Sequence, residues 1–209
     1  MEVLFLTNKA GGLLPGPNVR NYLSPIYKSD CDKLEGAQKS IFYGGILTMI
    51  KCKTTIQCID LRRIPAITEF RGKYAFLSNF YHAPITYRGH RYANNEAAFQ
   101  AQKTIYTKEQ QNFYMSHLSN PAVAKQLGRK LTLRPDWNQV KIRYMYEICF
   151  AKFLQHPNLL QALLATGDSV LIEDNTWGDR FWGCVDGFGE NHLGNILMDI
   201  RSKLNTELG

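Results

Sequence analysis

The chain has 209 residues, of which 44% are hydrophobic and 21% are charged, as is typical of a globular protein with one large domain or one domain and an appendage. This composition excludes collagen-like, disordered and disulfide-scaffold proteins. No apolar run approaches the roughly 20 residues that a membrane-spanning helix needs. The amino terminus also lacks the basic segment of a secretory signal, so we expect a cytoplasmic protein that does not act at a membrane.

The five cysteines and five histidines show none of the spacings that are typical of metal sites. An odd number of cysteines without a CxxC pair fits reduced thiols. We therefore expect neither a metal ion nor another cofactor. The net charge of +7 fits two interpretations: a solvated surface with a mild positive bias, or attraction for an anionic ligand such as a phosphate, a nucleotide or a nucleic acid.

The first part of the chain, residues 1–69, is expected to form an extension that is rich in loops. Glycines and prolines interrupt residues 7–40 and break any regular period. Apolar residues then alternate with polar ones over residues 46–59, which predicts a half-buried strand with a break or a turn inside it. The extension could complete a sheet, regulate access to a site or recognise a partner, and its residues do not separate these roles.

From residue 70 onward, the patterns predict one catalytic domain, residues 70–209. Residues 85–87 and 90–92 flank Arg88-Gly89 and predict a hairpin. Residues 169–173 predict a short strand. Helices are expected from Asn94 or Asn95 to about Ile105, from Thr107 with Gln110 completing a capping box, from Ser119 or Asn120 with Pro121 to Gly128, over residues 135–156, from Pro157 to Gly167, and after Asn191 as the cap. The predicted fold class is α+β, dominated by helices, with a small β-sheet.

The common nucleotide-binding and esterase signatures are incomplete or missing, so the candidate chemistry comes from other residues. Glu96, Phe99, Gln100 and Lys103 have the spacing that places side chains on neighbouring parts of one helix surface. A simpler interpretation of Glu96 is a carboxylate that stabilises the first turn of its helix.

A second candidate segment, residues 176–183, contains two tryptophans, two glycines and two opposite charges. Because tryptophan carries a large apolar area that must be covered or used, this segment is an unusual surface loop. It is therefore a candidate wall of a binding site.

Several dispersed motifs occur in one order, and in this order the chain resembles the YbiA-like family, also called NADAR. The resemblance covers about residues 70–204. The motifs are Phe76-Leu77-Ser78-Asn79-Phe80, Asn95-Glu96-Ala97-Ala98-Phe99-Gln100-Ala101-Gln102-Lys103, Leu127-Gly128-Arg129, Asp136-Trp137, Leu171-Ile172-Glu173, Asp179 with Phe181-Trp182-Gly183, and Asn191 with Leu193-Gly194.

The resemblance implies a metal-independent N-glycosidase, a hydrolase that cleaves the bond between ribose C1 and a nitrogen. Members of the family act on early phosphoribosyl pyrimidine intermediates of riboflavin synthesis, and others remove ADP-ribose from guanine bases. The residues that match the family's functional trio are Glu96, Asp179 and Trp137. The chain departs from the family pattern in two places: Asn95 stands where Ser is usual, and residues 174–178 are one residue longer.

The chemistry of the bond agrees with these assignments, because an oxocarbenium-like transition state needs a carboxylate near C1 and a proton donor near the departing nitrogen. We expect Glu96 to act as base or charge stabiliser with Asp179 as its partner, and which of them is the acid stays open. Trp137 could stack on the base or sugar, or anchor its helix in the core. The candidate substrate-binding residues are Lys103, Arg129 and Arg180 for phosphate, Asn79 and Asn191 for ribose hydroxyls, and their neighbours Phe99, Gln100, Trp182 and Gly183.

Three functions remain open at this point. The first is hydrolysis of a phosphate-bearing N-ribosyl small molecule. The second is removal of an ADP-ribosyl group from guanine, with nucleic acid as the carrier of the modification. The third is binding of ADP-ribose or a nucleotide without catalysis.

Overall fold

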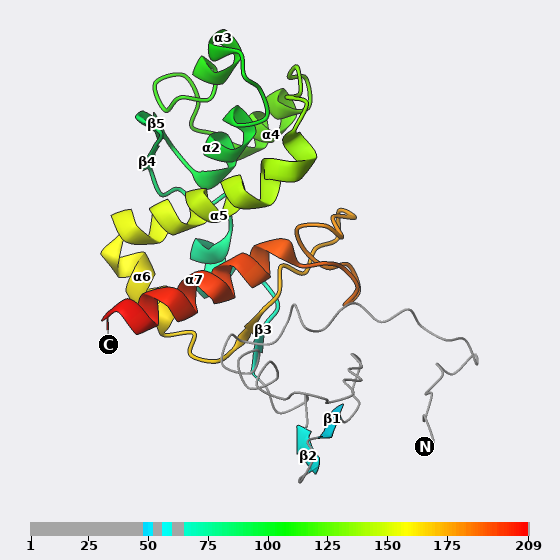
Figure 1. The fold of residues 1–209 in the computed structure, drawn as a ribbon. Coiled ribbons are helices and arrows are strands. Elements are labelled where there is room, and N and C mark those ends of the chain that lie inside the picture. The colour runs from blue at the N-terminus through cyan, green and yellow to red at the C-terminus, as the bar shows by residue number, and fades with distance from the viewer. Residues whose placement is uncertain (1–47, 52–55, 60–64, 209) are drawn as a thin grey trace, which may run out of the picture.

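The computed structural model describes residues 48–51, 56–59 and 65–208 (Figure 1). Helices outweigh strands among these residues, which confirms the expected helix-dominated α+β fold. The predicted loop at residues 7–40 lies outside them. The elements are β1 (Thr48–Lys51), β2 (Ile56–Ile59), β3 (Ala66–Ile67), the 3-10 helix η3 (Gly72–Leu77), β4 (Ile85–Tyr87), β5 (His90–Tyr92), α2 (Asn95–Ala101), α3 (Thr107–Gln111), α4 (Pro121–Gly128), α5 (Trp137–Gln155), α6 (Pro157–Leu164), β6 (Val170–Leu171) and α7 (His192–Leu208).

Helix α5 is the centre of the arrangement. It packs against α2 and β4 on one side and against α6 and α7 on the other, and Figure 1 shows it crossing the middle of the molecule. Its apolar residues recur at three- and four-residue steps, so the helix buries side chains toward both groups of neighbours. No helix among the described residues is long and apolar enough to cross a membrane.

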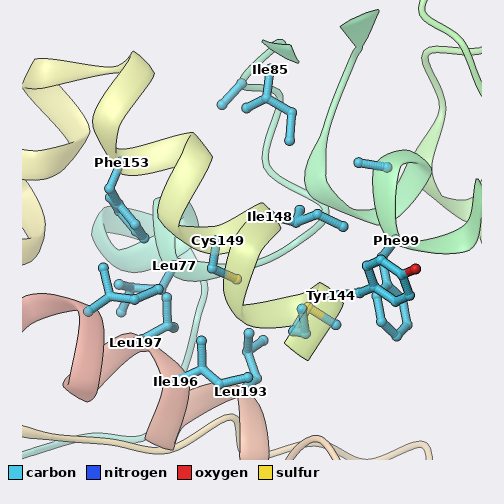
Figure 2. Packing of buried hydrophobic residues seen from close by; sticks show 14 of the residues in the cluster. Leu77, Ile85, Phe99, Tyr144, Ile148, Cys149, Phe153, Leu193, Ile196 and Leu197 are labelled. Carbon is cyan, nitrogen blue, oxygen red and sulfur yellow. The ribbon is translucent and has the colours of Figure 1, made fainter. Parts of the chain in front are cut away.

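The hydrophobic core lies between these helices. Figure 2 shows Phe153 of α5 near Leu77 of η3 and Leu197 of α7, and each of these side chains is at most 1% exposed. Full burial of one such side chain stabilises the fold by about 1.5–3 kcal/mol. The core therefore fixes η3, α5 and α7 relative to one another. The segment that follows η3 and the segment that precedes α7 are each joined to one of these fixed elements.

The strands among the described residues form three separate pairs. Within the region where a strand with a break or a turn was predicted, residues 46–59, β1 and β2 pair antiparallel with Thr48 opposite Ile59. The predicted hairpin also forms, from β4 and β5, and both turn residues, Arg88 and Gly89, have the positive φ angles of a type I′ turn. The Arg88 guanidinium donates to Glu147 on α5 at 3.2 Å, which ties this strained turn to the central helix.

The third pair joins distant parts of the chain, since β3 and β6 run parallel with Ile67 opposite Leu171. Strand β3 precedes residue 70, yet it pairs with a strand of the carboxyl-terminal part. The division at residue 69 therefore stays a proposal about domain organisation.

Two helix boundaries differ from the sequence-based predictions in a way that hydrogen bonds explain. Helix α2 ends at Ala101 rather than near Ile105, because the Gln102 side chain donates to the Ala98 carbonyl and closes the last turn. The predicted capping box at Thr107 does not form, since Thr107 is already helical and the Gln110 side chain donates to the Thr104 carbonyl instead. The other predicted helices, over residues 121–128, 137–155, 157–164 and 192–208, are present.

Candidate functional site

A cleft of about 830 Å³ opens between three helices and the loop that follows β6. Each helix contributes side chains at helical spacing, so each presents one face to the cleft. The contributors are Glu96, Phe99, Gln100 and Lys103 from α2 and the turn after it, Ala122, Lys125, Gln126 and Arg129 from α4 and its end, and Trp137, Lys141 and Met145 from α5. The loop adds Glu173, Asp174, Trp177, Asp179, Phe181 and Trp182, and the region around η3 adds Phe70, Arg71, Ser78, Asn79 and Phe80.

Glu96 lies in the first turn of α2 and faces this cleft. The Asn94 side chain caps the helix by accepting from the Ala97 N–H at 2.9 Å, which leaves Glu96 free of the capping role. The Glu96 side chain is buried, and its Oε1 accepts a hydrogen bond of 2.7 Å from Gln100 Nε2. Burial raises the pKa of Glu96, while Gln100 and nearby lysines oppose that shift. Glu96 is therefore both the carboxylate in the first turn of α2 and a carboxylate that lines the cleft.

Asp179 reaches the cleft from the loop after β6. Its Oδ1 accepts hydrogen bonds from the backbone N–H groups of Phe181 and Trp182, at 3.2 and 2.9 Å. Asn175 fixes the other side of the turn, because its side chain accepts from the Asp179 N–H and donates to the Asp179 carbonyl. The negative charge of Asp179 acts on both Glu96 and Glu173, so the three carboxyl groups share one electrostatic environment.

Glu173 is a cleft residue that the sequence analysis did not select. It lies two residues after the end of β6 and lines the same cleft as Glu96 and Asp179. The pKa of Glu173 is raised to about 8, mainly by burial and also by the negative charges of Asp179 and Glu96, while Lys125 lowers it. A carboxyl at the end of the predicted strand, residues 169–173, was the sequence signal that could have identified it.

Three cations form a basic side of the cleft. Lys103 follows α2, whereas Lys125 and Arg129 lie one turn apart on the facing side of α4. Burial lowers the pKa of Lys103, Glu96 raises it, and the positive charges of Lys125 and Arg129 lower it. These cations make no ion pair with an acidic residue within the described part of the chain, so their charge is available to an anionic ligand.

Aromatic rings form another part of the cleft wall. Phe99 contacts both Trp137 and Trp182, with ring centroids 5.1 and 5.3 Å apart, and Phe181 lies 4.9 Å from Trp182. Lys141 lies over the Phe181 ring at 3.8 Å. Trp137 is buried and also stacks near Tyr144, so it anchors α5 in the core and forms part of the cleft at the same time.

Two exposed rings stand where the cleft meets solvent. The Phe80 side chain is 41% exposed and that of Trp177 is 55% exposed, and both line the cleft. Lys125 Nζ lies between them, 5.8 Å from the centroid of the Phe80 ring and 5.6 Å from that of the Trp177 ring. We call these three residues the rim.

Asn79, another predicted site residue, lines the cleft and is held in place by hydrogen bonds with its neighbours. Its carbonyl accepts from the Glu96 N–H at 3.1 Å, and its side-chain amide donates to Met145 Sδ at 3.2 Å. Asn95 is buried and donates to Asn79 Oδ1 at 3.4 Å. Asn95 therefore supports Asn79 and leaves the cap of α2 to Asn94.

The structure brings most of the predicted site residues together, but three do not line the cleft. Arg180 is exposed and lies outside the lining, although its neighbours on both sides face the cleft. Asn191 is fully buried, where its side chain accepts from the Glu173 N–H at 3.0 Å and donates to the Leu171 carbonyl at 2.8 Å. Gly183 is buried against the Glu173 carbonyl, which would lie 2.1 Å from an added Cβ.

The sequence analysis also missed the contribution of α4. Ala122, Lys125, Gln126 and Arg129 repeat the spacing that marked Glu96, Phe99, Gln100 and Lys103, so a second helix stripe was visible in the sequence. Only Arg129 of this stripe was selected.

Among the described residues, no group of three or more His, Cys, Asp or Glu side chains could hold a metal ion.

Comparison with known proteins gives consistent results. Residues 68–205 match the model of the NADAR domain. The chain is 38% identical to an N-glycosidase of Nostoc punctiforme over 63% of this chain and 86% of that protein, and 38% identical to the N-glycosidase YbiA of Escherichia coli over 64% and 84%. It is also 38% identical to a riboflavin biosynthesis protein of Vibrio vulnificus over 63% of this chain and 36% of that protein. The solved structure of Escherichia coli YbiA superposes with a TM-score of 0.60 at 35% identity, covering 70% of this chain and 92% of that chain.

Proposed function

Because the chain belongs to the NADAR family and is an N-glycosidase, a hydrolase of N-glycosyl bonds, we propose that it cleaves the ribose C1–nitrogen bond of a phosphoribosyl pyrimidine intermediate of riboflavin biosynthesis, or of a related N-ribosyl nucleotide. The observation that carries this proposal is that Glu96 and Asp179, 83 positions apart in the sequence, line one cleft with aromatic rings beside them.

The carboxyl groups fit the reaction because ribosyl C–N cleavage develops positive charge at C1. A carboxylate in a partly desolvated cleft stabilises such a charge more strongly than it would in water. Glu96 and Asp179 are the proposed base and charge stabiliser on the sugar. Trp137 and the adjacent rings provide an apolar surface for the sugar or the heterocycle.

The cations fit the phosphate of such a substrate. Lys103, Lys125 and Arg129 converge on one side of the cleft without an acidic partner among the described residues. Arginine binds a phosphate through two parallel hydrogen bonds and lysine through a point charge. Lys125 therefore takes the place in the phosphate site that the sequence analysis gave to Arg180, beside Lys103 and Arg129. Since phosphate esters do not cross membranes readily, we propose that the enzyme acts in the cytoplasm, where such substrates are made.

A second candidate substrate is an ADP-ribosyl group on a guanine base, with nucleic acid as the carrier. The rim favours this alternative, because Phe80 and Trp177 offer exposed ring faces beside Lys125. A phosphoribosyl pyrimidine has one heterocyclic base and one phosphate, whereas an ADP-ribosyl substrate brings a second base and a second phosphate. An aromatic surface at the mouth of a basic cleft would bind that second ring by stacking.

The test is to incubate the full chain separately with a phosphoribosylaminopyrimidine and with an ADP-ribosylated guanine oligonucleotide, and to separate the products by chromatography. Release of ribose 5-phosphate and free base from the first substrate supports the main proposal. Release of ADP-ribose, without cleavage of the first substrate, supports the alternative. Tight binding of both compounds without any product would show a binding module and overturn both.

A further inference from the structure

We propose that Glu173 is the general acid that gives a proton to the departing nitrogen, and that Asn191 and Gly183 are positioning residues that hold Glu173 in place. This inference rests on the proposed N-ribosyl hydrolysis. It adds a third carboxyl group to the pair formed by Glu96 and Asp179, and it gives a role to two residues that were expected to touch the substrate but do not line the cleft.

The Glu173 backbone is held on both sides by hydrogen bonds. Its N–H donates to the Asn191 side chain at 3.0 Å, and its carbonyl accepts from the Cys184 N–H at 2.9 Å. The Asn191 amide also donates to the Leu171 carbonyl at 2.8 Å, so one buried side chain bridges the residues on both sides of Ile172. Gly183 packs so closely on the Glu173 carbonyl that a Cβ atom would lie 2.1 Å from it. Two backbone hydrogen bonds and one close contact therefore fix the starting point of this side chain.

The Glu173 carboxyl differs from the other two carboxyl groups in the hydrogen bonds that it accepts. Glu96 accepts a hydrogen bond from Gln100, and Asp179 accepts two from backbone N–H groups. No hydrogen bond to the Glu173 carboxyl forms within the part of the chain that the structure describes, although the residue lines the cleft. Hydrogen bonds to a carboxylate stabilise its charged form, so a group that lacks them in a desolvated position favours its neutral, proton-bearing form.

The surrounding charges act in the same direction. Burial is the main reason why the pKa of Glu173 is raised to about 8, and the negative charges of Asp179 and Glu96 add to it. Lys125 faces the Glu173 carboxyl from α4 and lowers its pKa. Asp174, the next residue in the chain, also lines the cleft. A general acid works best with a pKa near the working pH, and carboxyl groups whose environments differ divide into acid and base.

The proposed reaction balances with water as the other reactant. The C1–N bond breaks, its electron pair stays with nitrogen, and the Glu173 proton moves to that nitrogen. The oxygen of a water molecule then forms the new bond to C1, and Glu96 or Asp179 takes one proton from this water. The products are ribose 5-phosphate and the free amine. Return of the proton to Glu173 through solvent restores the starting enzyme.

The experiment compares two leaving groups on the same ribose 5-phosphate: an aminopyrimidine, which needs a proton to depart, and p-nitrophenolate, which leaves as a stable anion. In Glu173→Gln, kcat/KM should fall by roughly 10²–10⁴-fold for the aminopyrimidine and stay close to the wild-type value for the nitrophenyl compound. Glu96→Gln is the matched control, because loss of a charge stabiliser at C1 should slow both compounds. In the wild-type enzyme, kcat/KM for the aminopyrimidine should fall as the pH rises through the pKa of Glu173, and Glu173→Gln should lack this alkaline decrease.

The two positioning residues are tested with the same pair of compounds. Gly183→Ala and Asn191→Ser should each lower kcat/KM for the aminopyrimidine more than for the nitrophenyl compound, whereas a general loss of folded protein would lower both equally. Where one variant does not fold, the other provides the comparison.

The outcomes separate this inference from the proposed function. A wild-type enzyme that cleaves neither compound contradicts the proposed function itself. A wild-type enzyme that cleaves the aminopyrimidine, with a Glu173→Gln variant that is unimpaired or equally slow on both compounds, overturns the role of Glu173 alone.

Discussion

The Gln100 side-chain amide donates a hydrogen bond of 2.7 Å to Glu96 Oε1, and the two residues lie four positions apart on one face of α2. Side chains at this spacing are neighbours on a helix. The Gln100 amide also lies directly against Gly128 of α4, where an added Cβ would come within 1.8 Å of Gln100 Oε1. The orientation of the Glu96 carboxyl therefore depends on a glycine in another helix.

Gly128→Ala should lower kcat through this contact. The new methyl group displaces the Gln100 amide, and the loss of its hydrogen bond raises the pKa of Glu96 further. The measurement is kcat against pH, where the acidic limb should move to higher pH. Val123→Ala is a suitable control, since Val123 lies on the same helix, is exposed and does not line the cleft. An acidic limb that stays in place in Gly128→Ala would show that Gln100 does not tune Glu96.

Arg129→Met should raise KM for a phosphorylated substrate by about tenfold or more, because a charge-assisted hydrogen bond contributes roughly 1.5–3 kcal/mol. KM for the matching compound without phosphate should stay unchanged. Lys130→Met is the control, since Lys130 is the next residue along, exposed and outside the cleft lining. Steady-state kinetics with both compounds check this prediction, and equal effects on the two compounds would remove Arg129 from the phosphate site.

Trp177→Ala separates the two candidate substrates. Trp177 is more than half exposed, so its truncation should have little effect on stability. If an ADP-ribosyl group is the substrate, its affinity should fall by about 1–3 kcal/mol, the contribution of one stacked base. Affinity for a phosphoribosyl pyrimidine should not change. Titration calorimetry measures both, and Phe188→Ala is the control because Phe188 is also exposed but lies outside the cleft lining.

Lys152 gives a prediction about stability. It is fully buried in α5, and its ammonium donates to the carbonyls of Phe76 and Ser78, directly before Asn79. Burial lowers the pKa of Lys152 to about 8 from its ordinary value of 10.5. Between these two pH values the unfolded chain binds the proton and the folded chain does not, so the contribution of Lys152 to the free energy of unfolding rises with pH.

The free energy of unfolding of the wild-type enzyme should therefore increase relative to that of Lys152→Met as the pH rises from about 8 to 10.5. Denaturant titrations of both proteins at several pH values measure this difference. A difference that is constant or decreases over the range would contradict a buried lysine with a lowered pKa.

Local patterns in the sequence predicted much of the fold. The hairpin at Arg88-Gly89 and the helix that starts at Pro121 depend on turn and cap chemistry within a few residues, and both form as expected. The pairing of β3 with β6 depends on contacts that no short window contains. Such contacts are set by tertiary packing, which overrides local propensity.

The same distinction applies to the site. The stripe from Glu96 to Lys103 was predictable because a helix brings these residues to one surface. Arg180 was selected as a phosphate ligand in the segment 176–183, but neighbours in a loop need not face the same way, and Lys125 supplies the cation from another helix. Asn191 and Gly183 were selected as substrate contacts, whereas both act on the Glu173 backbone, a relationship that appears only when β6 and the start of α7 come together.

The most direct test of a glycosidase centred on Glu96 is the single-turnover rate of ribose 5-phosphate release by the wild-type enzyme, Glu96→Gln and Asp179→Asn, with each variant first shown to be folded and to bind substrate. Both variants should retain binding and release product roughly 10²–10⁴-fold more slowly than the wild-type enzyme. Release by Glu96→Gln at the wild-type rate would contradict the account, because the carboxylate at the centre of the cleft would then have no part in breaking the bond.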